Sequence, residues 1–478
     1  MNSLRITSPR TLTLLKALTL LLGIGLVALY GWLVVVQPAA ADQLTAVLMI
    51  GLNILLVLYD PMAGFLMWIF VVPFAKFLPF DLHMPAGVPD LSFSRVVGGF
   101  LVLYLLAQTA RRRYRLPNLT ALELVIPFYV IALGIAAARS MFGWVTGFQA
   151  VLDSYIMPLL AYFIARYLLA NKRDYRSLGN VLILMAVILA VLATLEQLFG
   201  IQLFRTETTA DYYTRGIRKV GALLGNPAYI ALAINVTLPM VLLRIIQATR
   251  PRTRWFYVGI FLLLETGIFL TYNRSGYLGS LLVLLVLALL NGRLRRYVIP
   301  LLLVGGLVAF FSWNAIQNSN AGTRLTAESP VDYRLQAIQI GLEIHREQPI
   351  FGAGLGSFGR LAARRGFDIG HAFVLPTPHN TYLDMLVSGG YVLLGTYLLL
   401  AAALALTLFR QGLRFRRRLR ATPLYLQAAW ASMFAYYIPT ATFDIAFSYY
   451  SNMIFWTIMG AVITRSMLDT PEAVQDAV

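Results

Sequence analysis

The stretch PTPHNTYLDMLVSGGYVLLGTYLLL (residues 376–400) leads from a polar entry into a long apolar run. A run of about 20 apolar residues can cross the roughly 30 Å hydrocarbon core of a membrane as a helix. Such a helix satisfies its own backbone hydrogen bonds, as the bilayer interior requires. His379, one of four histidines in 478 residues, stands at the mouth of the run. A lipid-facing helix has no use for an imidazole, so His379 is a candidate functional residue, although a lone histidine there is more often an interface residue.

The composition of the whole chain predicts the same environment. Hydrophobic residues make up 59%, charged residues 13%, and the mean hydropathy is +0.72, which is typical of a membrane protein. The chain contains no cysteine, which excludes disulfides and Cys-ligated metals. We predict an all-α polytopic membrane protein with about 12–14 transmembrane helices. The spans are expected near 11–36, 43–59, 62–80, 94–109, 120–138, 151–169, 179–199, 221–246, 255–272, 275–290, 297–314, 381–409, 424–440 and 447–465.

The net charge of +18 is concentrated in short loops that fall on one side of this predicted arrangement. Under the positive-inside rule, arginine-dense loops lie in the cytoplasm. The charge therefore indicates topology anchors and contacts with anionic membrane lipids, and no nucleic-acid partner. The loops are residues 110–118, 170–176, 248–254, 291–297 and 410–422.

The remaining segments divide the chain into four parts. Residues 1–314 form transmembrane helices, 315–380 an extracytoplasmic cap, 381–468 further transmembrane helices, and 469–478 a cytoplasmic tail. The cap contains PVDYRLQAIQIGLEIHREQP (330–349), which carries apolar residues near helical spacing before a proline stop. It predicts an amphipathic helix at the membrane surface or against the body. The apolar positions are Leu335, Ile338, Leu342 and Ile344.

A glycine motif in the cap resembles a cofactor-binding fingerprint. GLGSFG (354–359) matches the G-x-G-x-x-G pattern, but that fingerprint needs a preceding strand and a parallel sheet. Here the motif follows a predicted helix and a proline. We interpret it as a flexible turn that lets the backbone approach the membrane or a substrate, and we expect no cofactor.

Four segments in this order resemble the O-antigen ligase and O-antigen polymerase superfamily of bacterial envelope glycosyltransferases. The most specific signal is His379–Asn380 followed by Gly390; a second glycine usually comes three residues later, where this chain has Leu393. The resemblance covers about residues 200–400 and implies a fold like that of the C-type glycosyltransferases. The four segments are RKVGALLGNPAYIA (218–231), NRSG (273–276), DYRLQAIQIGLEIHREQPIFGAGLGSFG (332–359) and PHNTYLDMLVSGG (378–390).

The resemblance implies transfer of a glycan from undecaprenyl diphosphate to an acceptor hydroxyl on the periplasmic face of the bacterial inner membrane. The leaving diphosphate needs fixed positive charge, and arginine matches phosphate oxygens with a planar fork. Arg218 and Arg274 fall where the family's essential arginines lie. Arg215 competes with Arg218 for this assignment, and Arg334 on the cap helix is a third candidate. Each would otherwise be an arginine reaching to lipid headgroups.

His379 has two possible roles in such a reaction. A neutral imidazole, whose ordinary pKa is about 6.5, can take the proton from the acceptor hydroxyl; a protonated one can bind the diphosphate. We favour the base, because arginines already supply charge. Direct attack would invert the anomeric carbon, and no metal ligand pair appears on the outer face. Asn380 either orients the imidazole or caps the next helix. The remaining histidines, His83, His345 and His371, are expected to be surface or cap residues.

Other functions stay open at the level of the sequence. A lipid-linked oligosaccharide flippase or polysaccharide exporter would show internal repeats and ionisable residues at the membrane midplane, which are not evident here. An accessory subunit would not need the arginines and the histidine. Within the enzyme class, ligases and polymerases use the same donor and differ in whether the acceptor is a lipid A core, another lipid-linked repeat or a protein. We favour the ligase, because the residues around His379–Asn380 resemble that branch of the family.

Overall fold

The computed structural model describes residues 36–75, 77–82, 84, 90–112, 118–169, 172–204, 220–311, 329–367, 376–419 and 422–469. Within these ranges the chain is helical and contains no strand; a single isolated bridge joins Leu82 to Leu91. This confirms the all-α fold class. The span predicted near 11–36 lies almost wholly outside the described residues, and the tail lies outside them beyond Asp469.

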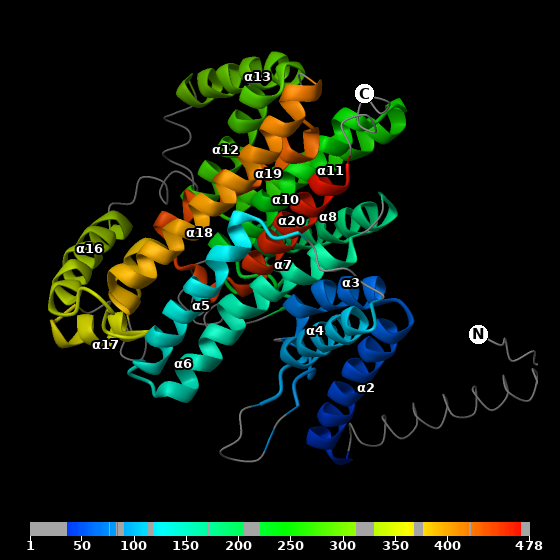
Figure 1. The fold of residues 1–478 in the computed structure, drawn as a ribbon. Coiled ribbons are helices and arrows are strands. Elements are labelled where there is room, and N and C mark those ends of the chain that lie inside the picture. Colours follow the sequence, from blue (N-terminus) through cyan, green and yellow to red (C-terminus); the bar gives the residue numbers. More distant parts are fainter. Residues whose placement is uncertain are drawn as a thin grey trace, which may run out of the picture.

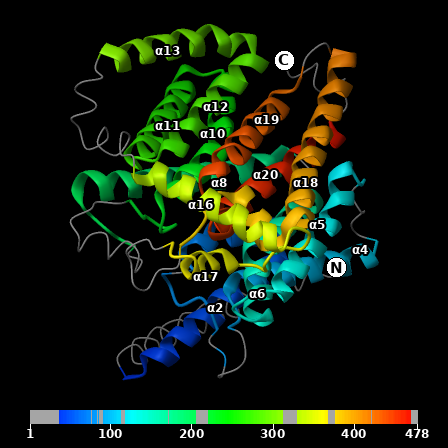
Figure 2. The same ribbon diagram turned by 90° about the vertical axis from the view of Figure 1, so that its left-hand side faces the viewer.

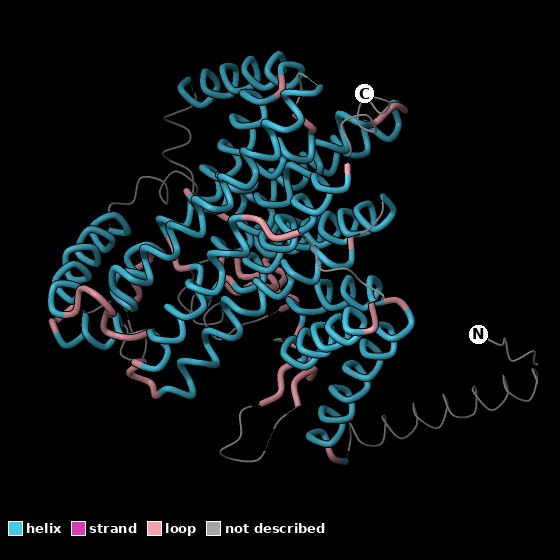
Figure 3. Tube along the Cα trace, viewed as in Figure 1, coloured by secondary structure: helices cyan, strands magenta, loops and turns pink. Residues whose placement is uncertain are grey.

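The described helices form an inclined bundle (Figures 1 and 3). The helices are α2 (Pro38–Tyr59), α3 (Pro61–Val71), α4 (Phe93–Ala110), α5 (Ala121–Ala138), α6 (Trp144–Val151), α7 (Met157–Leu168), α8 (Lys172–Thr194), α10 (Pro227–Gln247), α11 (Pro251–Leu270), α12 (Arg274–Leu290), α13 (Gly292–Phe311), α16 (Ser329–Glu347), α17 (Ser357–Arg364), α18 (Thr381–Leu419), α19 (Leu424–Tyr437) and α20 (Tyr449–Leu468). Five short turns complete them: η1 (Val72–Phe74), η2 (Leu152–Ile156), η3 (Leu195–Phe199), η4 (Pro439–Thr442) and η5 (Ile445–Phe447).

Eight segments of the described chain are long and apolar enough to cross a membrane. The segments Pro61–Phe74 and Arg274–Leu290 are shorter apolar helices. α13 is angled away from α11 and α12 in both views and is not one of the eight (Figures 1 and 2). The total of 12–14 spans therefore stays a prediction. The eight segments are Pro38–Tyr59, Phe93–Ala110, Ala121–Ala138, Trp144–Leu168, Asp174–Phe199, Pro227–Gln247, Pro251–Leu270 and Thr381–Arg417.

The distribution of apolar side chains is that of a protein surrounded by lipid. α11 exposes Trp255, Phe256, Leu262 and Phe269 while it buries Leu264 against the bundle. A water-soluble protein rarely exposes contiguous apolar surface on this scale. On a membrane-spanning helix the same side chains face hydrocarbon at no cost.

Polar residues begin the helices at the positions that capping chemistry predicts. Asp60 accepts hydrogen bonds from the backbone N–H groups of Met62 and Ala63, and Pro61 occupies the first helical position of α3. Asn226, before Pro227, does the same for α10 by accepting from the N–H of Ala228. At Asp60, α2 ends at Tyr59 and α3 begins at Pro61, so a single capping residue separates the two helices.

The centre of the bundle is built around α20, which is buried along nearly its whole length. α20 packs against α7, and Gly460 makes this contact close: a Cβ placed there would lie 2.4 Å from the carbonyl oxygen of Tyr162. α18 packs along α5, while α10 and α12 pack against α19. Long-range packing of this kind brings loops far apart in the sequence to one end of the bundle.

α16 and α17 lie at that end of the bundle, beside the start of α18; we call it the cap end (Figures 1 and 2). α16 packs against α18, but of the apolar residues predicted for its apolar face only Ile344 is fully buried, while Leu335 and Leu342 are exposed. The reason is steric, since a Cβ on Gly341 would lie 2.8 Å from a methyl carbon of Leu383 on α18. The face against the body is therefore made of small residues and Ile344.

Candidate active site

His379 lies in the short loop that enters α18 at the cap end. Its backbone is left-handed, with φ of 46°, which is uncommon for any residue but glycine. Asn380 is the N-cap of α18: its side-chain oxygen accepts from the N–H groups of Tyr382 and Leu383 at 3.0 and 3.1 Å. Of the two roles predicted for Asn380, the structure supports the cap. The side chain of His379 is 49% exposed and so remains open to a substrate.

The left-handed backbone is held by a buried acid that sequence reasoning missed. Asp444, in the turn between η4 and η5, is 2% exposed. Its two oxygens accept from the backbone N–H of His379 at 3.2 Å and of Asn380 at 3.0 Å. One of them, Oδ2, lies 3.8 Å from Nδ1 of the imidazole. Asp444 thus fixes the loop and places a carboxylate beside the ring.

Burial, reinforced by the negative charge of Asp384, raises the pKa of Asp444 to about 7, against the opposing effect of its hydrogen bonds. The carboxylate therefore gains its charge only as the pH rises through about 7. An ionised Asp444 stabilises a proton that His379 has taken up, while a neutral one does not. The feature of the sequence that could have pointed to Asp444 is its position as the lone acid in the short turn between two predicted spans.

The Asp444→Asn variant tests this positioning role. We expect turnover to fall roughly 10- to 100-fold, because a hydrogen bond to a charged group contributes about 1.5–3 kcal/mol. The native rate should fall as the pH drops through about 7, where Asp444 gains a proton. The variant should lose this part of the pH profile, which a purely structural defect would leave in place. Rates measured from pH 5 to 9 for the native protein and for Asp444→Asn distinguish the positioning role from a purely structural defect.

One tyrosine and two threonines complete the surroundings of His379. Tyr333 of α16 lies against the imidazole, with the ring centroids 5.4 Å apart, and its hydroxyl donates to the carbonyl of Thr377 at 2.7 Å. The hydroxyl of Thr377 is 3.2 Å from Nδ1 of His379. Thr381 donates to the carbonyl of Phe443 at 2.7 Å, which ties the start of α18 to the turn that carries Asp444. The cap helix, the entry loop and the η4–η5 turn therefore meet at His379.

Two of the four predicted arginines, Arg274 and Arg334, lie within the described residues. Arg274 is the first residue of α12, behind the N-cap Asn273, and α12 contacts η4. Arg334 is on α16, next to Tyr333, and burial, with a further contribution from the charge of Arg274, lowers its pKa. Arg334 thus lies within reach of the charge of Arg274, and its neighbour Tyr333 lies against His379. Two cations within reach of each other suit the binding of a polyanion. Arg215 and Arg218 lie outside the described residues.

The described end of the loop that carries Arg215 and Arg218 is anchored by a second buried acid. Glu196, in the π-helical turn η3, is 2% exposed and accepts from the N–H groups of Gly221 and Ala222 at 2.9 and 2.8 Å. π-turns recur at functional sites. Sequence reasoning assigned Glu196 to a span and did not anticipate this contact.

Gly390 interrupts α18 and receives the loop that follows α16. Its φ and ψ of 62° and −158° are accessible in practice only to glycine. The break frees backbone groups on both sides, and residues 349–354 satisfy them. Arg139, at the end of α5, donates to the carbonyl of Gly352 at 3.0 Å. Four hydrogen bonds join the loop to the break: Ala353 N–H to Val387 O at 2.8 Å, Gly354 N–H to Ser388 O at 3.0 Å, Tyr391 N–H to Pro349 O at 2.9 Å, and Val392 N–H to Ile350 O at 3.2 Å.

The glycine motif lets the backbone approach a neighbouring helix closely. Gly354 has φ of 99°, and a Cβ there would lie 2.0 Å from the carbonyl oxygen of Arg139. The turn therefore packs against the end of α5, and its approach to the membrane or a substrate stays a prediction. Leu393, which departs from the family pattern, is fully buried and packs closely on Gly389.

The Gly390→Ala variant should be strongly destabilised. The backbone conformation costs a non-glycine residue about 1–3 kcal/mol, and the added Cβ would lie 2.4 Å from the carbonyl oxygen of Ile350. Gly395→Ala is the matched control, because no atom lies within 4 Å of a Cβ there. Thermal unfolding in detergent should show a lower Tm for the first variant and an unchanged or higher Tm for the second. Equal Tm values for the two would contradict the described break.

Of the other histidines, only His345 lies within the described residues. His345 is 5% exposed, and its ring packs edge-on against Tyr391 at 4.6 Å, so it is a buried residue of the cap helix and not a surface one. His83 and His371 lie outside the described residues. Within the described ranges, no three His, Cys, Asp or Glu side chains gather in a way that could hold a metal ion.

Residues 258–398 match a family model described as O-antigen ligase. The matched segment contains Arg274, Arg334, His379, Asn380 and Gly390. It confirms the resemblance to the O-antigen ligase superfamily. No curated protein matches the chain.

Proposed function

We propose that this chain, a member of the O-antigen ligase superfamily by its segment 258–398, transfers a glycan from undecaprenyl diphosphate to an acceptor hydroxyl. The family match supports a multi-pass membrane protein that acts as a glycosyltransferase of the ligase or polymerase type. The observation that carries the finer proposal is the position of exposed His379 against Tyr333, the neighbour of Arg334 on α16, with Arg334 itself within reach of the charge of Arg274. We place this end at the periplasmic face of the bacterial inner membrane.

The chemistry follows from the charges at the site. His379 takes the proton of the acceptor hydroxyl as its oxygen attacks the anomeric carbon, and the bond from that carbon to the diphosphate oxygen breaks. Attack from the side opposite to the leaving group inverts the anomeric centre. Arg274 and Arg334, with Arg215 or Arg218, receive the charge that develops on undecaprenyl diphosphate. Asp444 stabilises the imidazolium that forms.

An O-antigen ligase uses a lipid A core as acceptor, and this is the activity we propose. A polymerase that joins lipid-linked repeats remains the second candidate, because donor and site chemistry are shared. The decisive experiment incubates the purified protein with lipid-linked oligosaccharide and with each acceptor class separately. Glycan found on the lipid A core supports the ligase; elongated lipid-linked glycan supports the polymerase. Movement of the donor across vesicles without either product would support a flippase instead.

Transfer should proceed in the presence of a metal chelator. The proposed site holds the diphosphate with guanidinium groups, so a chelator has nothing to remove. The rate in EDTA should match the rate in magnesium or manganese within about twofold, measured as product per unit time. Loss of activity in EDTA that either metal restores would show that the charge comes from a cation.

A further inference from the structure

The turn that carries Asp444, residues 443–446, is held by side chains from elements far apart in the sequence; we call it the Asp444 turn. Thr381, at the start of α18, donates to the carbonyl of Phe443 at 2.7 Å and accepts from the N–H of Ile445 at 3.1 Å. Thr381 is 1% exposed, so both bonds are shielded from water. One side of the Asp444 turn is therefore fixed to the helix that follows His379.

The opposite side of this turn is held by Asn452, in the first turn of α20. Its amide nitrogen donates to the carbonyl of Ile445 at 2.9 Å and to the carbonyl of Ser154 at 3.2 Å. Its amide oxygen accepts from the hydroxyl of Tyr436 on α19 at 2.8 Å. Two carbonyl groups can bond only to the NH2 end of the amide, so this orientation satisfies all three partners. Asn452 is 2% exposed and joins these elements in one buried network.

The π-helical turn η2 directs Ser154 into the same network. The hydroxyl of Ser154 donates to the carbonyl of Ala446, while its carbonyl accepts from Asn452. A π-turn interrupts the regular hydrogen-bond ladder of an α-helix, so its carbonyl groups can accept from side chains. The preceding residue, Asp153, holds Arg95 of α4 with both carboxylate oxygens, at 2.8 and 2.7 Å. η2 is therefore tied to α4 as well as to the Asp444 turn.

We propose that Asn452, supported by Ser154, is a positioning residue that acts on the reaction through Asp444. The inference rests on the proposed function and adds the residues that set the position of Asp444 relative to His379. The carboxylate reaches the imidazole only while the backbone on both sides of Asp444 keeps its place, and Asn452 donates to that backbone. Without its amide, the carbonyl groups of Ile445 and Ser154 would each lose a buried donor, and the turn would shift to restore the hydrogen bonds.

The titratable groups around Asp444 come from several elements of the described chain. The phenol groups among them keep their protons between pH 5 and 9, because the ordinary pKa of tyrosine is about 10. The amide of Asn452 carries no charge, so a variant there acts on Asp444 through position and not through charge. These titratable groups are His379 of the entry loop, Asp384 of α18, Tyr155 of η2, Tyr229 of α10 and Tyr333 of α16.

The Asn452→Leu variant tests the proposal. Leucine is similar in size and excludes water, but it removes both donor bonds. Turnover should fall roughly 10- to 100-fold, while the KM for the donor changes less than about threefold because the arginines are untouched. The native rate falls below about pH 7, and we call this part of the profile the acid limb. It should move to higher pH by at least about half a unit, because the N–H bonds to Asp444 that favour its charged form are weakened.

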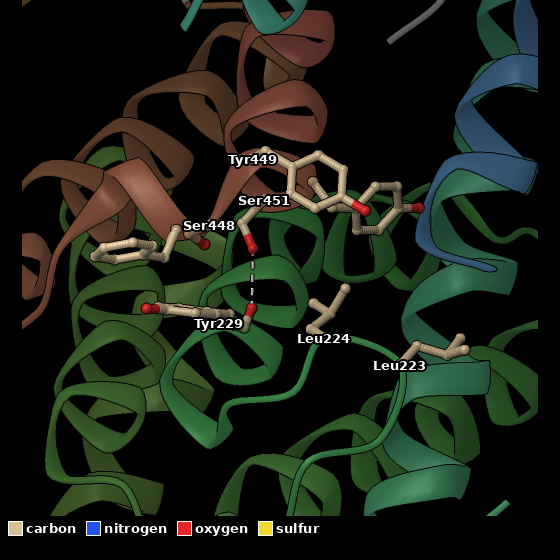
Figure 4. A pocket seen from close by; sticks show the side chains of 8 residues that line it. Leu223, Leu224, Tyr229, Ser448, Tyr449 and Ser451 are labelled. Carbon is tan, nitrogen blue, oxygen red and sulfur yellow. Dashed lines mark hydrogen bonds between the residues drawn. The ribbon is translucent and has the colours of Figure 1, made fainter. Parts of the chain in front are cut away.

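The neighbouring Ser451 provides the matched control. Its hydroxyl donates to the carbonyl of Tyr229 on α10 at 2.9 Å, as Figure 4 shows. Ser451→Ala therefore loses a hydrogen bond on the same helical turn but none to the Asp444 turn. We expect a lower Tm, turnover within about twofold of native and an unmoved acid limb. An acid limb that stays in place or moves to lower pH in Asn452→Leu, or an equal shift in Ser451→Ala, would overturn the proposal.

Two adjacent tyrosines test the network with a smaller change. Tyr436→Phe removes the hydroxyl that orients the amide of Asn452 but keeps the ring, which stacks on Phe455 at 3.9 Å. Tyr437→Phe is its control, since the hydroxyl of Tyr437 has no hydrogen-bond partner within the described residues. Turnover should fall at least about threefold in the first variant and less than about twofold in the second, even if Asn452→Leu fails to fold. Equal turnover in the two would contradict the network.

The chemical reactivity of His379 separates failure of this proposal from failure of the proposed function. Diethyl pyrocarbonate modifies neutral imidazole, and mass spectrometry of peptides identifies which of the four histidines reacts. A displaced Asp444 removes a negative charge that favours the protonated ring, so His379 in Asn452→Leu should react at a pH lower by at least about half a unit. This shift without any transferred glycan would support the positioning and overturn the proposed function. Glycan transfer with equal reactivity in the native protein and the variant would overturn the positioning.

Discussion

Replacing His379 with alanine is expected to lower glycan transfer by roughly 100- to 10,000-fold, the usual range for losing a general base. The imidazole is 49% exposed at the cap end and lies beside buried Asp444, so it can meet an acceptor and keep a proton. The carboxylate of Asp444 beside it is buried and accepts from two backbone N–H groups, so it is poorly placed to meet an acceptor itself. Turnover is measured at saturating donor and acceptor with purified protein.

The left-handed backbone at His379 requires a second variant. Alanine is strained at φ of 46°, whereas asparagine tolerates this region and has no basic nitrogen. We expect His379→Asn to lose as much activity as His379→Ala. An asparagine variant with near-native turnover would show that the alanine defect came from the backbone and that the base lies elsewhere.

Replacing Arg274 with alanine should lower turnover roughly 30- to 1000-fold, which corresponds to about 2–4 kcal/mol of transition-state stabilisation. The cap of α12 is supplied by Asn273, so the helix itself should persist. Arg274→Lys should rescue only in part, because lysine keeps the charge and loses the planar fork. Full rescue by lysine would argue for a point charge without bidentate contact.

An exposed arginine of the same cap provides the control for general charge effects. Arg346→Ala, on the last turn of α16, should change turnover less than twofold. A loss as large as that of Arg274→Ala would mean that the cap attracts the donor through its overall field. The turnover of Arg334→Ala should fall about as far as that of Arg274→Ala if the two side chains bind one diphosphate.

The helices could be predicted from the sequence because the bilayer sets their length and polar residues set their ends. The span expected at 120–138 became Ala121–Ala138, after the Thr120 cap. The span expected at 275–290 became Arg274–Leu290, after Asn273. Local chemistry decides both ends, so no knowledge of the packing was needed.

The break in α18 and the buried face of α16 could not be predicted in this way. Gly390 is one of two adjacent glycines in a continuous apolar pattern, and only the incoming loop at 349–354 reveals why the helix breaks there. On α16, the size of Gly341 decided the contact with Leu383, while the prediction followed hydropathy.

The candidate site residues that lie in one stretch, such as His379 and Asn380, could be identified from the sequence. Asp444 acts on that stretch from 64 and 65 residues away, through contacts that only the fold creates. Glu196 likewise holds residues 25 positions further on. A single sequence carries no record of such pairs, so both acids were missed.

Donor-lipid affinity, measured side by side for His379→Ala and Arg274→Ala, tests the central division of roles most directly. The proteins are titrated with undecaprenyl-diphosphate-linked glycan without acceptor. We predict a native Kd for His379→Ala and a Kd at least tenfold higher for Arg274→Ala, because the arginine binds the diphosphate and the histidine acts on the acceptor. An equal loss of donor affinity in both variants would contradict the account and make His379 a phosphate ligand.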